Sequence, residues 1–208
     1  MPPDDPDITA LTGSRICHDL ASPVGAALTG LDFLSGAPGT ADPGVMALLR
    51  DSLTGARATL EMLRTAFGRA GTGAARDAAS LGATARGHLA ARPRLQFDWA
   101  LDGPLTPATE QHLALAILCA AHALPRGGTL AVARSAQDVR VTVTAGGDLT
   151  ADPALWDGLA DQSALPAPDP RQVEFHLLAA HIARGNARIT VTRDAQNVAI
   201  VLSTPAQD

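Results

Sequence analysis

The N-terminal third of the chain carries hydrophobic side chains at the three- and four-residue steps of amphipathic helices. Between residues 8 and 34 these positions share one side of a helix: Ile16, Leu20, Val24, Ala27, Leu31 and Leu34. Residues 35–44, SGAPGTADPG, are dense in Gly, Pro and Asp and predict a turn. A second helix follows, with a heptad-like seam of Met46, Leu49, Leu53, Ala56, Leu60, Leu63, Phe67 and Ala70. The pattern predicts an antiparallel helical hairpin.

A seam of this length needs more than one partner helix. Two hairpins related by a two-fold axis close into a four-helix bundle, in which each seam is covered. The sequence therefore predicts a homodimer. We assign residues 8–72 to this hairpin and residues 1–7, which are acidic and rich in proline, to a flexible N-terminus.

The rest of the chain predicts alternating helices and strands after a Gly- and Ala-rich junction at 69–79. Helices are expected around 79–91, 107–124, 151–159 and 170–185, and strands at 94–101, 129–135, 138–145, 187–193 and 197–203. The second and third strands flank the turn Ala136-Gln137 and predict a β-hairpin. This order favours a mixed sheet covered by helices on one face, an α/β sandwich over 78–204. The predicted fold class is α+β.

Composition and charge exclude several functions. The net charge of −5 comes without a basic stripe, so we expect no nucleic-acid partner. No stretch approaches the roughly 20 apolar residues of a membrane span, and the acidic N-terminus is unlike a signal peptide. Cys17 and Cys119 lie far apart and form no Cys-x-x-Cys motif, which indicates neither a disulfide framework nor a zinc site. We expect a cytoplasmic protein.

Residues 15–24, RICHDLASPV, hold the strongest candidate for chemistry. On a helical wheel, the residues within about 40° of His18 are small or polar; they are Ser14, Ser22, Gly25, Thr29 and Asp32. His18 should therefore face solvent, where another protein can approach it. A carboxylate such as Asp19 beside one ring nitrogen fixes the tautomer and makes the other nitrogen more nucleophilic. The pattern alone also fits an ordinary exposed histidine.

The string His18-Asp19-Leu20-x-x-Pro23 resembles the H-box of two-component histidine kinases, which lies on the first helix of a dimeric hairpin. The longer string CHDLASPVGAALTGLDFL resembles that of ChpT-type bacterial histidine phosphotransferases, with Cys17 through Pro23, Gly25 and Gly30-Leu31 matching. The resemblance covers nearly the whole chain as hairpin, junction and ATPase-like sandwich. It implies that His18 is a phosphoacceptor and that Asp19 acts as its orienter or base.

The resemblance also allows the ATP-binding boxes of a kinase to be compared with this chain. Kinases use an Asn on a helix, an Asp-x-Gly box after a strand and a second glycine-rich loop before a helix. The corresponding positions here are Cys119, Thr144 and the glycine-free stretch 166–172, PAPDPRQ. Phosphate-cradling amides and polar ligands for adenine and Mg²⁺ are thus missing. We expect no bound nucleotide, cofactor or metal, and a degenerate ATPase-like domain.

A histidine without its own ATP site must receive phosphate from elsewhere. The resemblance implies a receiver domain of a CckA-type hybrid kinase as donor and CtrA- and CpdR-type response regulators as acceptors. The Mg²⁺ for transfer is expected in the receiver. Two alternatives remain, a non-catalytic dimeric scaffold that binds receivers and an ATP-dependent histidine kinase. The sequence leaves open the particular receivers, the direction of net flow and the role of the second domain.

Receiver contacts are expected on both helices of the hairpin. Arg57 and Arg64, one heptad apart beside the apolar seam, and Arg15 near His18 are candidates to meet an acidic receiver surface. A solvated flank of a coiled coil is the alternative for the first two. Ser22 and Gly25 share the side of His18 and are further receiver-binding candidates, although Ser22 also fits a simple surface serine.

Overall fold

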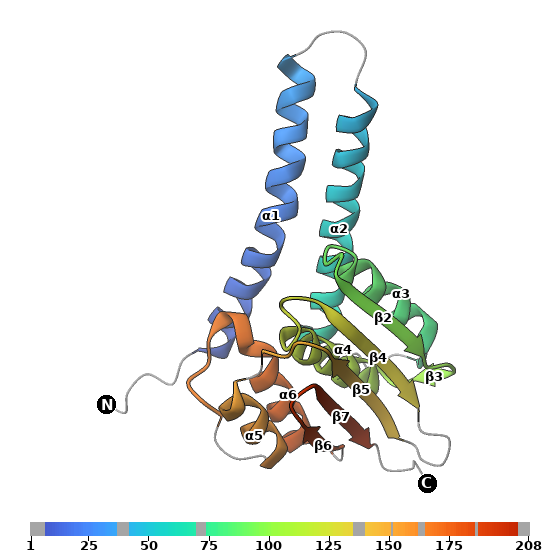
Figure 1. Ribbon diagram of the computed structural model, residues 1–208, viewed down its shortest axis with the longest axis vertical. Helices are drawn as coiled ribbons and strands as arrows, with labels where there is room; N and C mark the ends of the chain where they lie inside the picture. Colours follow the sequence, from blue (N-terminus) through green and yellow to red (C-terminus); the bar gives the residue numbers. More distant parts are fainter. Residues whose placement is uncertain are drawn as a thin grey trace.

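The computed structural model describes residues 7–36, 42–69, 74–134, 140–150, 152–161, 165–185 and 187–203, with the backbone alone at 140–143. It consists of a long helical hairpin standing on a layer of helices and strands (Figure 1). Several predicted features lie outside the described residues: nearly all of the flexible N-terminus, the centre of the turn between the first two helices, part of the junction and the turn Ala136-Gln137.

The hairpin consists of α1 (Ile8–Gly36) and α2 (Pro43–Phe67). Helix α1 continues through Pro23, and α2 begins where the Asp42 side chain accepts a hydrogen bond from the Gly44 amide. The two helices approach closely at Gly30, because a Cβ atom there would lie 3.0 Å from the Leu49 side chain. The predicted pair of antiparallel helices is therefore present, with α2 ending three residues before the last position of its predicted seam.

A five-stranded sheet forms the centre of the second layer. Its strand order is β2 (Leu95–Ala100), β4 (Gly128–Arg134), β5 (Arg140–Gly146), β7 (Asn197–Ser203) and β6 (Arg188–Arg193). Only the β2–β4 pair is parallel, and β4 and β5 form the predicted antiparallel hairpin. The short strands β1 (Arg76–Asp77) and β3 (Pro104–Leu105) form a separate antiparallel pair that sequence analysis did not predict.

One face of the sheet is buried. Phe97, Leu130, Ala145 and Val198 are register partners in successive strands, and all four are buried. The helices α3 (Ala78–Leu89) and α4 (Pro107–His122) pack on the sheet, α6 (Val173–Arg184) packs on α4, and α5 (Pro153–Asp161) packs on α6 and β6. This arrangement, visible in Figure 1, confirms the predicted α+β fold class.

Helix α4 is buried on all sides. Every residue from Glu110 to Ala121 is buried, because the sheet, α2 and α6 surround the helix. The Gln111 side chain donates a hydrogen bond to the backbone carbonyl of Ala66, which ties α4 to the last turn of α2. The base of the hairpin is therefore fixed to the second layer. Within the described part of the chain, no helix is long and apolar enough to cross a membrane.

We predict that Gly82→Val destabilises the protein. A Cβ atom at this position of α3 would lie 2.7 Å from the Trp99 ring, whose indole nitrogen is held by a hydrogen bond to the Leu101 carbonyl. Overpacking of this kind lowers the free energy of unfolding by about 1–3 kcal/mol. Urea denaturation measures the change. The control is Gly13→Val on α1, where the new Cβ would meet no atom within 4 Å beyond its chain neighbours and the adjacent helix backbone. Equal stability of the two variants would contradict the close packing at Gly82.

Candidate functional site

His18 lies on the exposed side of α1. Its side chain is 65% exposed, and the predicted neighbours Ser14, Ser22 and Gly25 on the same side are exposed as well. Because these neighbours are small, they leave the imidazole open to the surface of another protein. The ring is thus placed as the helical wheel predicts.

Asp19 holds one nitrogen of the His18 ring. Nδ1 of His18 lies 3.0 Å from Oδ1 of Asp19. An ionised carboxylate can only accept hydrogen bonds, so this contact requires a hydrogen on Nδ1 and leaves the lone pair of Nε2 free in the neutral ring. The Asp19 side chain is itself only 17% exposed. The pair thus combines a fixed tautomer with an accessible nucleophile.

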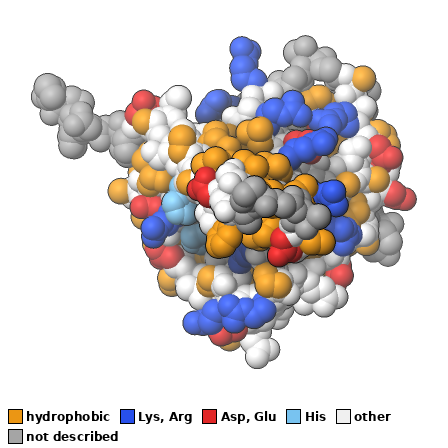
Figure 2. All heavy atoms as spheres, turned by 90° about the horizontal axis from the view of Figure 1, so that it is seen from above, with side chains coloured by type: hydrophobic (Ala, Val, Ile, Leu, Met, Phe, Trp, Pro, Cys, Tyr) orange, Lys and Arg blue, Asp and Glu red, His pale blue; other side chains and the backbone are white. Residues whose placement is uncertain are grey.

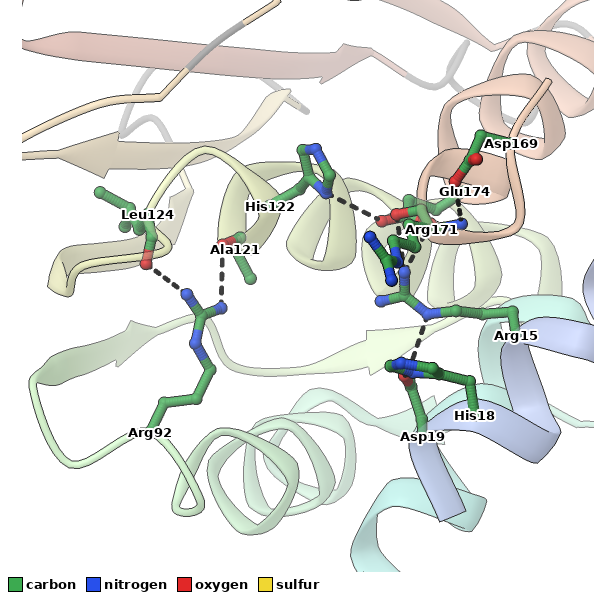
Figure 3. A network of polar contacts seen from close by, with 10 residues as sticks. All are labelled: Arg15, His18, Asp19, Arg92, Ala121, His122, Leu124, Asp169, Arg171 and Glu174. Atoms are coloured by element: carbon green, nitrogen blue, oxygen red, sulfur yellow. Dashed lines mark hydrogen bonds and ion pairs between the residues drawn. The ribbon is translucent and has the colours of Figure 1, made fainter. Parts of the chain in front are cut away.

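Arg15 connects this pair to the second layer (Figure 3). Its Nε donates a hydrogen bond of 2.8 Å to Oδ2 of Asp19, one turn further along α1. Its Nη1 donates a hydrogen bond of 2.6 Å to the backbone carbonyl of Arg171, in the short 3₁₀ helix η1 (Pro170–Gln172). Sequence analysis proposed that Arg15 meets a receiver. In the structure its side chain is 17% exposed, and its guanidinium is occupied within the chain.

Glu174, in the first turn of α6, is fully buried next to this arginine. Its Oε2 lies 3.8 Å from Nη1 of Arg15, and its Oε1 lies 3.9 Å from Nδ1 of His122. Among the described residues, neither oxygen has a hydrogen-bond partner. Burial raises the pKa of Glu174 to about 7, and the Arg15 charge opposes this shift.

Glu174 and its contacts are not among the site residues predicted from the sequence. The available signal was a lone acid among the apolar residues of VEFHLLAAHIARG. That signal marks a buried charge that needs a partner, but it does not say which cation supplies it. The partner lies on α1, at the opposite end of the chain.

The predicted receiver contacts on α2 are exposed. Arg57 makes an ion pair with Glu61 one turn later on the same helix, with 2.9 Å between Nε and Oε1, and Arg64 also faces solvent. The arginines are therefore accessible. The geometry by itself fits both a docking surface and a solvated helix flank.

The positions that correspond to the kinase ATP boxes lie on a buried helix, on a strand and in a short helical turn. Cys119 is fully buried in α4, and burial raises the pKa of its thiol. Thr144 lies on β5, and residues 170–172, at the end of the glycine-free stretch, form η1, which packs against α1. No cluster of His, Cys, Asp and Glu that would hold a metal ion occurs among the residues described.

Comparison with known proteins shows the family. The family model "Histidine phosphotransferase C-terminal domain" matches residues 78–197. The protein phosphotransferase ChpT of Brucella abortus (strain 2308) is 31% identical over 196 residues, which cover 92% of this chain and 93% of that protein. The chain belongs to the ChpT histidine phosphotransferase family. A solved structure of a bacterial phosphotransferase superimposes with a TM-score of 0.76 at 28% identity, and 98% of each chain is covered.

Membership of the ChpT family confirms two predictions from the sequence. The resemblance carried by the His18 segment named the correct family, and the chain is a phosphotransferase. The similarity to the solved phosphotransferase extends over both the hairpin and the second layer. The roles assigned to individual residues stay predictions. The distances given above state which atoms each role would use.

We predict that Glu174 makes stability fall as the pH rises. Because its pKa is raised from 4.5 to about 7 in the folded protein, the folded state keeps a proton that the unfolded state releases. The stabilisation is complete below pH 4.5 and is lost as the pH rises to about 7. Relative to Glu174→Gln, the wild type should lose about 1–3 kcal/mol of unfolding free energy over this range.

Urea denaturation of both proteins at several values between pH 4 and pH 8 measures this difference. The difference in unfolding free energy between the two proteins removes the pH dependence of the other titrating groups, because both proteins share them. The charged groups near Glu174 are Arg15 and Asp19 on α1, and His122 on α4 lies on its other side. Parallel stability curves for the two proteins would contradict the prediction.

Proposed function

We propose that this chain is a histidine phosphotransferase of a two-component phosphorelay, with His18 as phosphoacceptor. In this proposal His18 takes the phosphoryl group from the phospho-Asp of a receiver domain of a CckA-type hybrid kinase. It then passes the group to the Asp of CtrA- and CpdR-type response regulators in the cytoplasm. The observation that carries the proposal is the exposed His18 ring, held at Nδ1 by Asp19, in a chain of the ChpT family.

The transfer follows from the fixed tautomer of His18. The lone pair of Nε2 attacks phosphorus in line, the Nε2–P bond forms, and the bond from phosphorus to the receiver carboxylate breaks. The receiver Asp leaves as a carboxylate, and the positive charge on the phosphorylated imidazole is shared with Asp19 through Nδ1–H. Transfer to the second receiver is the reverse reaction. The chain thus supplies position and a nucleophile, and the receiver supplies Mg²⁺.

A receiver would approach the side of α1 on which His18 lies. The small side chain of Ser22 and the absence of one at Gly25 leave space for its phosphorylated pocket, and both residues are exposed. Arg57 and Arg64 would add positive charge on α2 opposite the acidic receiver surface. Arg15 is already engaged within the chain, and we give it a different role below.

Residues 8–72 would form the phosphotransfer hairpin, and residues 78–204 would form a kinase-like domain that does not bind ATP. The family model that starts at residue 78 supports this division. The buried Cys119 supports the loss of ATP binding, because it stands where the kinase resemblance places a polar Asn. The contact between η1 and α1 adds to this, because it engages the segment that leads into α6.

A second copy of the chain would cover the apolar side chains of the hairpin. Seen along the hairpin, hydrophobic side chains gather at its free end (Figure 2). Among the residues whose side chains the structure describes, the exposed large hydrophobic ones all lie on α1 and α2: Val24, Leu28, Leu31, Phe33, Met46, Leu48, Leu53 and Leu60. Burial of such a set favours the four-helix bundle of a homodimer.

We predict that incubation with a phosphorylated receiver labels this chain on His18. The label should be stable to base and labile to acid, as expected of a phosphorylated imidazole. Replacement of the nucleophile, His18→Ala, should abolish the label. His181→Ala, which removes a partly buried histidine of α6, is the matched control and should leave labelling intact.

The same assay separates the alternatives. Equal labelling of His18→Ala and wild type would contradict His18 as phosphoacceptor. Receiver binding without any label on either protein would favour the non-catalytic scaffold. Labelling from ATP alone, together with saturable nucleotide binding, would show an ATP-dependent kinase and overturn the proposed loss of the ATP site.

We predict that a charge in the apolar surface of the hairpin breaks the homodimer. Leu31→Glu places a carboxylate at a side chain that is 50% exposed in the single chain and that lines a groove between α1 and α2. Burial of this charge in the bundle is unfavourable, so the variant should elute as a monomer. Light scattering measures the mass. Thr29→Glu, on the His18 side of α1, should stay dimeric, and a monomeric wild type would contradict the proposal.

A further inference from the structure

The C-terminal domain makes a charged contact close to the phosphoacceptor. We propose that Glu174 and Arg15 are positioning residues for phosphotransfer, through which this domain fixes the orientation of Asp19 and thereby of His18. The inference rests on the proposed role of His18. It gives the second domain a function in the transfer step that does not need ATP.

The geometry makes Arg15 the link between the two parts. Its guanidinium makes three contacts at the same time. Nε donates a hydrogen bond of 2.8 Å to Asp19, and Nη1 donates one of 2.6 Å to the Arg171 carbonyl. Nη1 also lies 3.8 Å from Oε2 of Glu174. The planar guanidinium cannot rotate without breaking at least one of them. Figure 3 shows Arg15 lying between Asp19 of α1 on one side and Arg171 and Glu174 on the other, with His18 next to Asp19.

At pH values above its pKa of about 7, the Glu174 carboxylate provides the charge that holds this arginine. It is fully buried, and among the described residues it has no hydrogen bond that would compensate its burial. Burial, followed by the nearby Arg15 and Arg92, lowers the pKa of His122, so that His122 tends to stay neutral beside it. Arg15 is therefore the cation that faces Glu174. In surroundings of low dielectric constant this attraction restricts the guanidinium more than the same pair would in water.

The restricted arginine in turn limits Asp19. With Oδ2 bound to Arg15, Oδ1 is directed at Nδ1 of His18, 3.0 Å away. Without Arg15, the carboxylate can rotate about its side-chain bonds and exchange the His18 contact for water. The histidine would then lose its preference for the Nδ1–H tautomer, and a smaller fraction of rings would present a free Nε2.

Three variants of the full-length protein test this inference. Glu174→Gln removes the buried charge with little change of shape, and Arg15→Gln removes the link itself. Glu110→Gln is the matched control, because Glu110 is also a buried glutamate of the second layer and also faces an arginine, with 3.3 Å between its Oε1 and Nη1 of Arg76. All are compared by thermal unfolding, so that loss of fold is separated from loss of position.

We predict that at pH 8, where Glu174 is mostly ionised, Glu174→Gln and Arg15→Gln each lower the maximal rate of phosphoryl acceptance from a purified phosphorylated receiver by about ten-fold. The receiver concentration at half-maximal rate should stay within about two-fold, because the contacts removed by these substitutions all lie within the chain. The double variant should be no slower than Arg15→Gln alone, since both residues act through one link. Nitrogen NMR of the His18 ring should show less Nδ1–H tautomer in both variants, with Glu110→Gln resembling wild type.

The outcomes distinguish this inference from the proposed function. If wild type accepts phosphate on His18 and Glu174→Gln does so at the same maximal rate with the same tautomer, the positioning role is wrong and the phosphotransfer function stands. Equal slowing of Glu110→Gln and Glu174→Gln would show a structural effect and would also overturn it. If wild type accepts no phosphate, the proposed function fails, and an unchanged tautomer in Arg15→Gln would show that the link positions nothing. If Glu174→Gln does not fold, the Arg15→Gln rate and tautomer decide.

Discussion

The burial of α4 from Glu110 to Ala121 is the constraint on which the arrangement of the protein depends. A helix that is apolar on all sides must be covered on all sides, and here the sheet, α6 and the lower part of α2 provide the cover. The hairpin is therefore part of the same packed unit as the sheet at its base. Further from that base, Ala27, Gly30 and Leu49 are the only buried residues of the parts of α1 and α2 that the structure describes. The rigid end of the hairpin thus lies next to His18, and the end that lacks apolar cover lies away from it.

The rigid base of the hairpin explains how an exposed histidine, surrounded by small side chains, can be held in one orientation. His18 itself is exposed, and its one polar side-chain contact among the described residues is with Asp19. The restraint on it comes from Asp19 and Arg15, whose side chains are each 17% exposed, and from the fully buried Glu174 beyond them. The exposed histidine is thus held by a pair of half-buried side chains, and that pair contacts a buried one. Such an arrangement allows a surface residue to be ordered without larger neighbours that would obstruct a partner protein.

The sequence predicted what depends on local patterns. The helices around His18 and Met46 follow from apolar spacing, and the β4–β5 hairpin follows from two β-rich runs of similar length. The exposure of His18 and its contact with Asp19 are also local, since one helix determines both. The missed features are those that join distant segments. The β1–β3 pair has two residues in each strand, and the Arg15–Glu174 contact joins opposite ends of the chain, so neither leaves a periodic signal.

The hydrogen bond from Arg15 to position 171 ends on a backbone carbonyl. The side chain at that position takes no part in the bond, so a relative could carry almost any residue there and keep the same contact, provided that the main chain follows the same course. The turn made by the Asp169 side chain, which accepts from the amide of residue 171, helps to set that course. An alignment of residue identities would therefore show Arg15 but would not show its acceptor at position 171. Whether a relative keeps this contact has to be judged from the course of its main chain.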